Sequence, residues 1–215
     1  MANQRPFTFL LSLLSALLLT SLLLLSGLQF AQAQSARMLV LGDSISSGYG
    51  MKPEQGWVNQ LKNKLSQSGY DYQVINASIS GETSQGGLTR LPELLRQYQP
   101  DLVLIELGGN DGLRGLPLKL LQNNLSKMID LSQESKAQPI LLGIQLPPNY
   151  GRRYTQAFAG IYPKLAQEHK IPVMPFILQG IGTDSSKMQP DGIHPTGAAQ
   201  TELLENIWPV VQPLL

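Results

Sequence analysis

Hydrophobic residues after Arg37 form short, uninterrupted runs separated by longer amphipathic stretches. The first run, Met38 to Leu41, contains no polar residue and stops at Gly42-Asp43-Ser44. A strand that is buried on both faces and ends in a tight turn has this pattern. Similar runs follow near residues 72–75, 102–107, 140–144 and 173–174. We therefore predict five buried strands.

Between these runs, apolar residues recur every three or four positions, which is typical of a helix with one buried face. The first such segment begins at Trp57 and ends at Gly69, a residue type that often terminates helices. Four more helices are expected near residues 88–98, 117–129, 154–169 and 196–208, with Pro92 in the first turn of the segment near residue 88.

The regular alternation of strands and helices indicates the fold class. Parallel strands need right-handed crossovers, and each crossover places a helix on one face of the sheet. No repeat or linker interrupts residues 34–215. We expect one three-layer α/β/α domain built around a five-stranded parallel sheet.

Composition limits the classes of function. A chain of 215 residues with 42% hydrophobic residues is suited to one domain with a sizeable core. It contains no cysteine, so it has neither a disulfide nor a cysteine-linked lipid. Its 16 basic and 15 acidic residues leave no strong positive charge, which argues against a nucleic-acid partner. The adjacent pair Arg152-Arg153 is interpreted as a solvated surface pair.

The N-terminal segment has the pattern of an export signal. Arg5 precedes an apolar run from Phe7 to Leu25, and Ala31-Gln32-Ala33 provides small residues at a cleavage site. We expect residues 1–33 to be a signal peptide cleaved after Ala33, which gives an exported protein, periplasmic or secreted, without stable membrane insertion. The alternative is an uncleaved anchor, because the run approaches the roughly 20 residues that span a bilayer.

Ser44 is a candidate nucleophile. It follows the first strand, and ligands of open α/β sheets bind at the carboxyl ends of the strands. The alternative is that Ser44 only caps the following turn, as serine often does. The Gly81 loop, Asn110 and the segment from Asp191 to His194 can converge on the same sheet edge.

A nucleophilic serine needs a base that a third group orients. The chain has two histidines, and His169 lies at the end of a predicted helix, where its role is interpreted as structural. His194 lies in a loop three residues after Asp191 and is the candidate base. The spacing allows Asp191 to accept from one ring nitrogen while the other faces Ser44. The alternative is that both residues only cap turns.

Attack on a carbonyl creates an oxyanion, which needs preorganised hydrogen-bond donors. The backbone amides of Ser44 and Gly81 and the side-chain amide of Asn110 are the candidates for this oxyanion hole. Glycine at position 81 permits close approach of the backbone. Gly81 and Asn110 are also ordinary turn residues, which is the alternative interpretation of each.

Taken together, four ordered segments resemble the sequence blocks of the SGNH (GDSL) hydrolase family, and in particular its periplasmic arylesterase, acyl-CoA thioesterase and lysophospholipase branch. The similarity extends from Arg37 to the C-terminus. Ile45 stands where the family name expects leucine, and residues 178–188 are less similar to the family. The four segments are Gly42-Asp43-Ser44, the Gly81 loop, Gly108-Gly109-Asn110-Asp111 and Asp191-Gly192-Ile193-His194-Pro195.

This resemblance implies a flavodoxin-like sheet, Ser44 as nucleophile, Asp191 and His194 as the rest of the triad, and Gly81 and Asn110 as oxyanion donors. We expect a monomeric hydrolase of small acyl esters and thioesters that uses no cofactor and no metal. Apolar loop residues on the catalytic side are expected to hold the acyl chain, although each one can instead seal its loop to the core. These residues are Leu113, Leu116, Leu146, Pro147, Tyr150 and Ile181.

Two other functions fit the sequence less well. A carbohydrate acetylesterase would use the same triad with a different alcohol leaving group. A flavodoxin-like binding module would hold a phosphate or flavin in the loop from Ser44 to Ser47, and this leaves Asp191 and His194 without a role.

Overall fold

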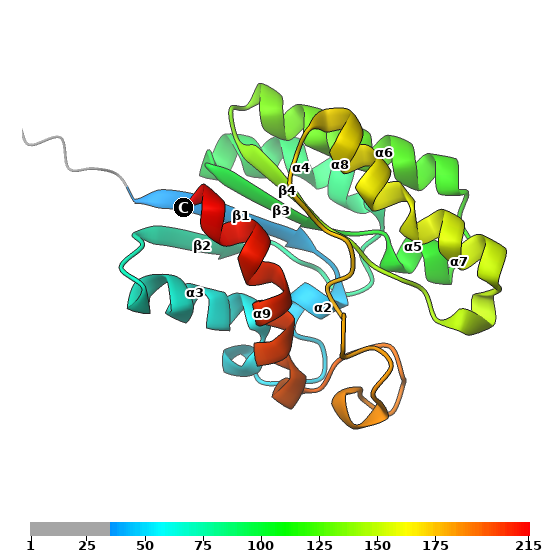
Figure 1. Cartoon of the computed structure of the whole chain (residues 1–215). Coiled ribbons are helices and arrows are strands. Elements are labelled where there is room, and N and C mark those ends of the chain that lie inside the picture. The colour runs from blue at the N-terminus through cyan, green and yellow to red at the C-terminus, as the bar shows by residue number, and fades with distance from the viewer. Residues whose placement is uncertain (1–34) are drawn as a thin grey trace, which may run out of the picture. The chain divides into compact units, whose positions relative to one another are not determined.

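The computed structural model describes residues 35–215, so the predicted signal peptide and its cleavage site lie outside the described residues. The five predicted strands form one sheet in the order β2-β1-β3-β4-β5, and every neighbouring pair is parallel (Figure 1). The strands are β1 (Ala36–Gly42), β2 (Tyr72–Asn76), β3 (Leu102–Glu106), β4 (Gln138–Leu142) and β5 (Val173–Met174).

Helices cover both faces of this sheet (Figure 1). On one face, α3 (Trp57–Gln67) packs beside α9 (Gln200–Val211). On the other face lie α4 (Ser84–Tyr98), α6 (Leu118–Glu134) and α8 (Ile161–His169). The prediction of a three-layer α/β/α fold is confirmed, and the strand order is the flavodoxin-like one.

The two faces explain why β1 reads as an unbroken apolar run. Leu39 and Leu41 belong to the core cluster with α4 and α6, whereas Met38 and Val40 belong to the cluster with α3 and α9. All four side chains are fully buried. Because a strand's side chains alternate between faces, a strand covered on both sides must be apolar at every position.

Two helix predictions need correction. Helix α4 begins at Ser84, where the Thr83 hydroxyl accepts a hydrogen bond from the amide of Gly86, so Pro92 lies inside the helix and not in its first turn. The helix predicted over residues 154–169 is two helices, α7 (Arg152–Ala159) and α8, separated at Gly160. Pro163 contributes to this break because it has no N–H to donate to the carbonyl four residues earlier.

Two short helices lie at the carboxyl end of the sheet. They are α2 (Ser44–Ser47), directly after β1, and α5 (Gly109–Leu113), directly after β3. The predicted site residues Ser44 and Asn110 therefore each lie in a short helical turn that directly follows a strand. Within residues 35–215, no helix has the length and apolarity that crossing a bilayer requires.

Candidate active site

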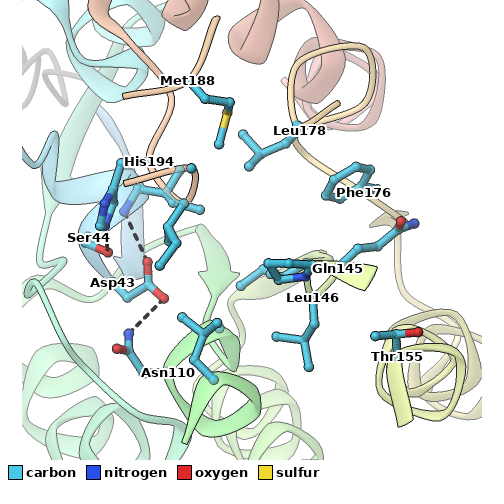
Figure 2. Close-up of a pocket in the computed structure, with 18 of the residues that line it drawn as sticks. Asp43, Ser44, Asn110, Gln145, Leu146, Thr155, Phe176, Leu178, Met188 and His194 are labelled. Atoms are coloured by element: carbon cyan, nitrogen blue, oxygen red, sulfur yellow. Dashed lines mark hydrogen bonds between the residues drawn. The ribbon is translucent and has the colours of Figure 1, made fainter. Parts of the chain in front are cut away.

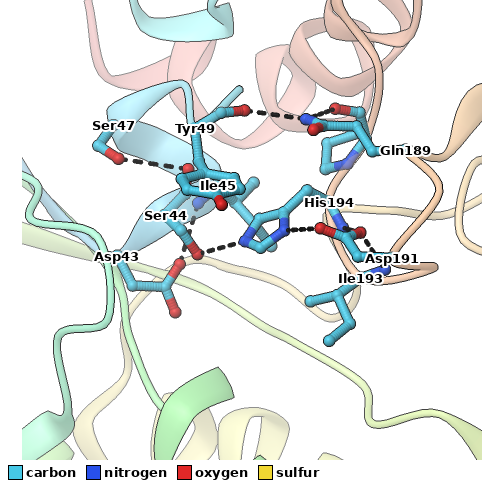
Figure 3. A network of polar contacts seen from close by, with 10 residues as sticks. Asp43, Ser44, Ile45, Ser47, Tyr49, Gln189, Asp191, Ile193 and His194 are labelled. Atoms are coloured by element: carbon cyan, nitrogen blue, oxygen red, sulfur yellow. Dashed lines mark hydrogen bonds and ion pairs between the residues drawn. The ribbon is translucent and has the colours of Figure 1, made fainter. Parts of the chain in front are cut away.

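Ser44 is the first residue of α2, but it does not cap that helix. The cap is Asp43, whose Oδ1 accepts a hydrogen bond of 3.1 Å from the amide of Ile45. The Ser44 hydroxyl instead lies 2.8 Å from Nε2 of His194 (Figure 3). The structure thus argues against the alternative in which Ser44 serves only as a helix cap.

His194 connects Ser44 to Asp191. Its Nδ1 lies 2.7 Å from Oδ2 of Asp191 (Figure 3). The other carboxylate oxygen, Oδ1, accepts hydrogen bonds from the backbone amides of Ile193 and His194 at 2.9 and 3.0 Å. Hydroxyl, imidazole and carboxylate therefore form one continuous hydrogen-bonded series.

The electrostatics of Asp191 suit an orienting group. Its partial burial alone would raise the pKa, but hydrogen bonds from the His194 ring, the His194 amide and the Ile193 amide lower the pKa to about 2. The carboxylate is therefore ionised at neutral pH and accepts from Nδ1–H. This leaves Nε2 as the nitrogen that can take the proton of Ser44.

The loop that holds His194 is fixed on several sides. Met188 and Pro195 form an isolated antiparallel bridge, and the amide of Gln189 donates to the carbonyl of His194 at 2.7 Å. The ring of Tyr49 packs on the imidazole with a centroid distance of 4.5 Å. Sequence reasoning missed Tyr49, because nothing in its local pattern distinguishes it from an exposed loop residue.

The three candidate oxyanion donors lie around the cavity that Ser44 lines. Gly81 has a φ of +79°, which favours glycine, and the Arg114 guanidinium donates to its carbonyl at 3.0 Å. Asn110 lies in the first turn of α5, and its Nδ2 donates to Oδ2 of Asp43 at 3.2 Å (Figure 2). Gly81 and Asn110 therefore both line the cavity that contains the nucleophile.

A pair of buried carboxyl groups lies behind the nucleophile, and sequence reasoning missed it. Glu106 at the end of β3 accepts hydrogen bonds from the Ser46 hydroxyl at 2.6 Å and from the Asp43 amide at 3.3 Å. Burial raises the pKa of Asp43 to about 6. Burial, and then the charge of Asp43, raises the pKa of Glu106 well above its usual value. The sequence indicated this pair only through Glu106, a single acidic residue near the end of an otherwise apolar run.

The cavity has a volume of about 900 Å³, and most of its wall is apolar (Figure 2). Three of the six predicted wall residues, Leu113, Leu146 and Pro147, line it. Its wall also contains residues that were not predicted, among them Gln145, Thr155, Phe176, Met188 and Ile193.

The other three predicted wall residues lie outside the cavity lining, which corrects that prediction. Ile181 is fully buried in the core beside α9. Tyr150 is 37% exposed and donates its hydroxyl to the carbonyl of Leu113 at 3.2 Å, so it supports the wall from outside. Leu116 is half-buried in the turn before α6.

The second histidine is held elsewhere. His169, at the end of α8, lies with Nε2 2.9 Å from the Ser126 hydroxyl and Nδ1 3.3 Å from the Asp130 carboxylate. It does not belong to the cavity lining around Ser44. The geometry agrees with the structural role that we predicted for it.

A hydroxyl, an imidazole and a carboxylate in series, beside N–H donors at the end of a parallel sheet, define a candidate serine-hydrolase site. The model of the GDSL-like Lipase/Acylhydrolase family matches residues 40–201, a range that contains every residue of this site. The chain belongs to this family.

Named relatives and solved structures agree with the assignment. "Esterase TesA" of Pseudomonas aeruginosa is 53% identical over 90% of this chain and 98% of its own length. "Arylesterase" of Vibrio mimicus is 50% identical over 87% and 94%. A crystal structure of TesA has a TM-score of 0.82 and 54% identity, covering 83% of this chain and 99% of its own. The psychrotrophic esterase EstA from Pseudoalteromonas sp., solved with monoethylphosphonate as inhibitor, has a TM-score of 0.78 and 42% identity, covering 82% and 97%.

Proposed function

We propose that this protein hydrolyses acyl esters and thioesters through an acyl-enzyme on Ser44. The observation that supports this most directly is the 2.8 Å contact between Ser44 Oγ and His194 Nε2, with Asp191 on the other ring nitrogen. Relatives point to the same reaction class, since a 45% identical protein of Escherichia coli is named "Thioesterase 1/protease 1/lysophospholipase L1".

The reaction follows from this geometry. His194 accepts the proton of Ser44 as Oγ attacks the substrate carbonyl, and Asp191 stabilises the imidazolium that forms. The negative charge on the former carbonyl oxygen is met by the N–H groups of Ser44, Gly81 and Asn110. His194 then returns the proton to the leaving alcohol or thiol. Water, activated by the same imidazole, cleaves the acyl-enzyme.

The cavity supports an acyl chain as the part of the substrate that is bound. Leu113, Leu146 and Leu178 contribute apolar side chains to its lining. Burial of a methylene group contributes about 0.8 kcal/mol. The value of kcat/KM should therefore rise as the acyl chain lengthens, until the chain outgrows the cavity.

A series of p-nitrophenyl esters and acyl thioesters, from acetyl to dodecanoyl, tests this function. We expect kcat/KM to rise from the acetyl ester through the medium-length chains for both leaving groups. Failure to hydrolyse any member would contradict the proposed function. A kcat/KM that is highest for the acetyl substrates and falls for longer chains would support the carbohydrate acetylesterase alternative. The binding-module alternative is not retained, because the chain belongs to a hydrolase family.

Asp191→Asn should lower activity, but less than loss of the nucleophile or the base. The amide cannot accept from both the ring and the backbone as the carboxylate does, so the His194 tautomer is less well fixed. Because 37% of the Asp191 side chain is exposed, water can replace part of its effect. We expect kcat to fall about 10- to 1,000-fold. Steady-state hydrolysis of a p-nitrophenyl ester measures this, and an unchanged kcat would exclude the orienting role.

We further propose that residues 1–33 are a signal peptide, removed after Ala33, and that the mature monomer functions in the periplasm or outside the cell. The basis is Arg5, the apolar run and the Ala31–Ala33 site. Intact mass spectrometry of exported protein should give a chain that begins at Gln34. A mass that retains the leader would instead support the anchor. Analytical ultracentrifugation, which gives the molar mass in solution, tests whether the mature protein is monomeric.

A further inference from the structure

Asp43 is a buried carboxylate directly beside the nucleophile, and the triad does not account for it. Its side chain is 2% exposed and contributes to the wall of the cavity. One oxygen caps α2 through the Ile45 amide at 3.1 Å. The other accepts the hydrogen bond of 3.2 Å from Nδ2 of Asn110 (Figure 2). The cap alone does not require a full charge, because serine or asparagine caps helices equally well.

The chemistry of the Asn110 amide explains what a negative charge on Asp43 would do. A primary amide has two N–H donors on nitrogen and one acceptor oxygen, and a carboxylate can only accept. An ionised Asp43 therefore holds the nitrogen of Asn110, not its oxygen, on the Asp43 side. If the amide turned over, its oxygen would take the nitrogen's place and repel a negative oxygen on the substrate.

We propose that Asp43 is a positioning residue for the oxyanion hole: it holds one N–H of Asn110 so that the other is presented to the substrate oxyanion. This inference rests on the proposed ester hydrolysis at Ser44. Asp43 makes no contact with substrate in this scheme and acts through Asn110.

The surrounding charges are consistent with an ionised Asp43 at neutral pH. Three titratable groups face it: Glu106 on β3, Tyr162 on α8 and His194 from the loop before α9. Burial raises the pKa of Glu106 and of Tyr162 well above their usual values, which favours the neutral form of each. His194 becomes positive when it takes the Ser44 proton, and a positive charge there favours the Asp43 anion.

A double-mutant cycle tests the proposal, with kcat for p-nitrophenyl butyrate at pH 8 in Asp43→Asn, Asn110→Ala and the double variant. We expect Asp43→Asn to lower kcat about 10- to 100-fold with KM changed less than about threefold, as for impaired transition-state stabilisation. In the Asn110→Ala background the same substitution should cost less than about twofold. An unchanged kcat in Asp43→Asn, or an equal loss in both backgrounds, would overturn the proposal.

Two further variants separate positioning from structure. Asp43→Ser keeps an N-cap acceptor for Ile45 but is too short to hold the Asn110 amide, so it should lose kcat as Asp43→Asn does. Glu106→Gln is the matched control, because it makes the same carboxyl-to-amide change beside Asp43, at a group whose neutral form burial favours. Its kcat should stay within about threefold of wild type. A loss in Glu106→Gln equal to that in Asp43→Asn would contradict a specific role for Asp43.

Thermal stability gives an independent readout. Burial raises the pKa of Asp43 from 3.8 to about 6, so its ionisation opposes folding as the pH rises through this interval. Asp43→Asn removes that opposition, and its Tm at pH 8 should equal or exceed that of wild type while its kcat is low. A fall in Tm that accompanies the loss of kcat would indicate a purely structural role. Phosphonate labelling of Ser44 must persist in this variant, and failure of labelling in the wild type would count against the proposed function itself.

Discussion

We expect Ser44→Ala to lower kcat/KM for a p-nitrophenyl ester by about 10⁴- to 10⁶-fold, because it removes the oxygen that forms the acyl-enzyme. The residual rate comes from the oxyanion donors and the cavity, which the substitution leaves in place. The variant should fold normally, since Asp43 and not Ser44 caps α2. Hydrolysis assays and intact mass after treatment with an organophosphonate measure the two consequences, lost turnover and lost labelling.

Ser47→Ala is the matched control for this experiment. Ser47 lies in the same helical turn, and its hydroxyl contacts that of Ser80 at 2.8 Å. We expect its kcat to remain within about threefold of wild type and its mass to increase by one phosphonate adduct. Full turnover by Ser44→Ala, or an adduct mapped to a different residue, would show that the nucleophile has been misassigned.

His194→Ala should have the second-largest effect, a loss of about 10³- to 10⁵-fold in kcat. Without the imidazole nothing takes the proton of Ser44, so both ester hydrolysis and phosphonate labelling slow down. The substitution leaves space under the ring of Tyr49, which packs on the imidazole in the native structure. Added imidazole should therefore restore part of the lost rate, and this rescue can be followed in the same assay.

His169→Ala controls for the general effect of removing a histidine. The chain has only these two histidines, and His169 contacts Ser126 and Asp130 on the helical layer. We expect this variant to keep the wild-type rate, with at most a small loss of stability. An equal loss of activity in both histidine variants would contradict the assignment of His194 as the proton acceptor.

The fold was predictable because each strand signal was local. The run from Met38 to Leu41 and the run from residue 102 to residue 105 in β3 are apolar at every position. This pattern alone is enough to predict a buried parallel strand. The convergence of the site segments followed from topology, since the carboxyl ends of parallel strands share one edge. The choice of His194 followed from there being two histidines, one of them at a helix end.

Features that depend on side-chain direction were not predictable. Leu146 and Tyr150 lie four residues apart, yet one faces the cavity and the other supports it from behind. The apolar side chain of Ile181 packs in the core and does not line the cavity. The contact of Asp43 with Asn110 joins residues 67 positions apart, and no local pattern specifies which oxygen or nitrogen faces inward.

The distance along the chain between Ser44 and His194 has a consequence for biosynthesis. The hydroxyl follows the first strand, and the imidazole comes 150 residues later, just before the last helix. A chain still emerging from the ribosome contains the Ser44 hydroxyl but not yet the His194 imidazole. We therefore expect the polypeptide to be inert toward acyl esters inside the producing cell until synthesis is complete, and to become active only when its final segment docks.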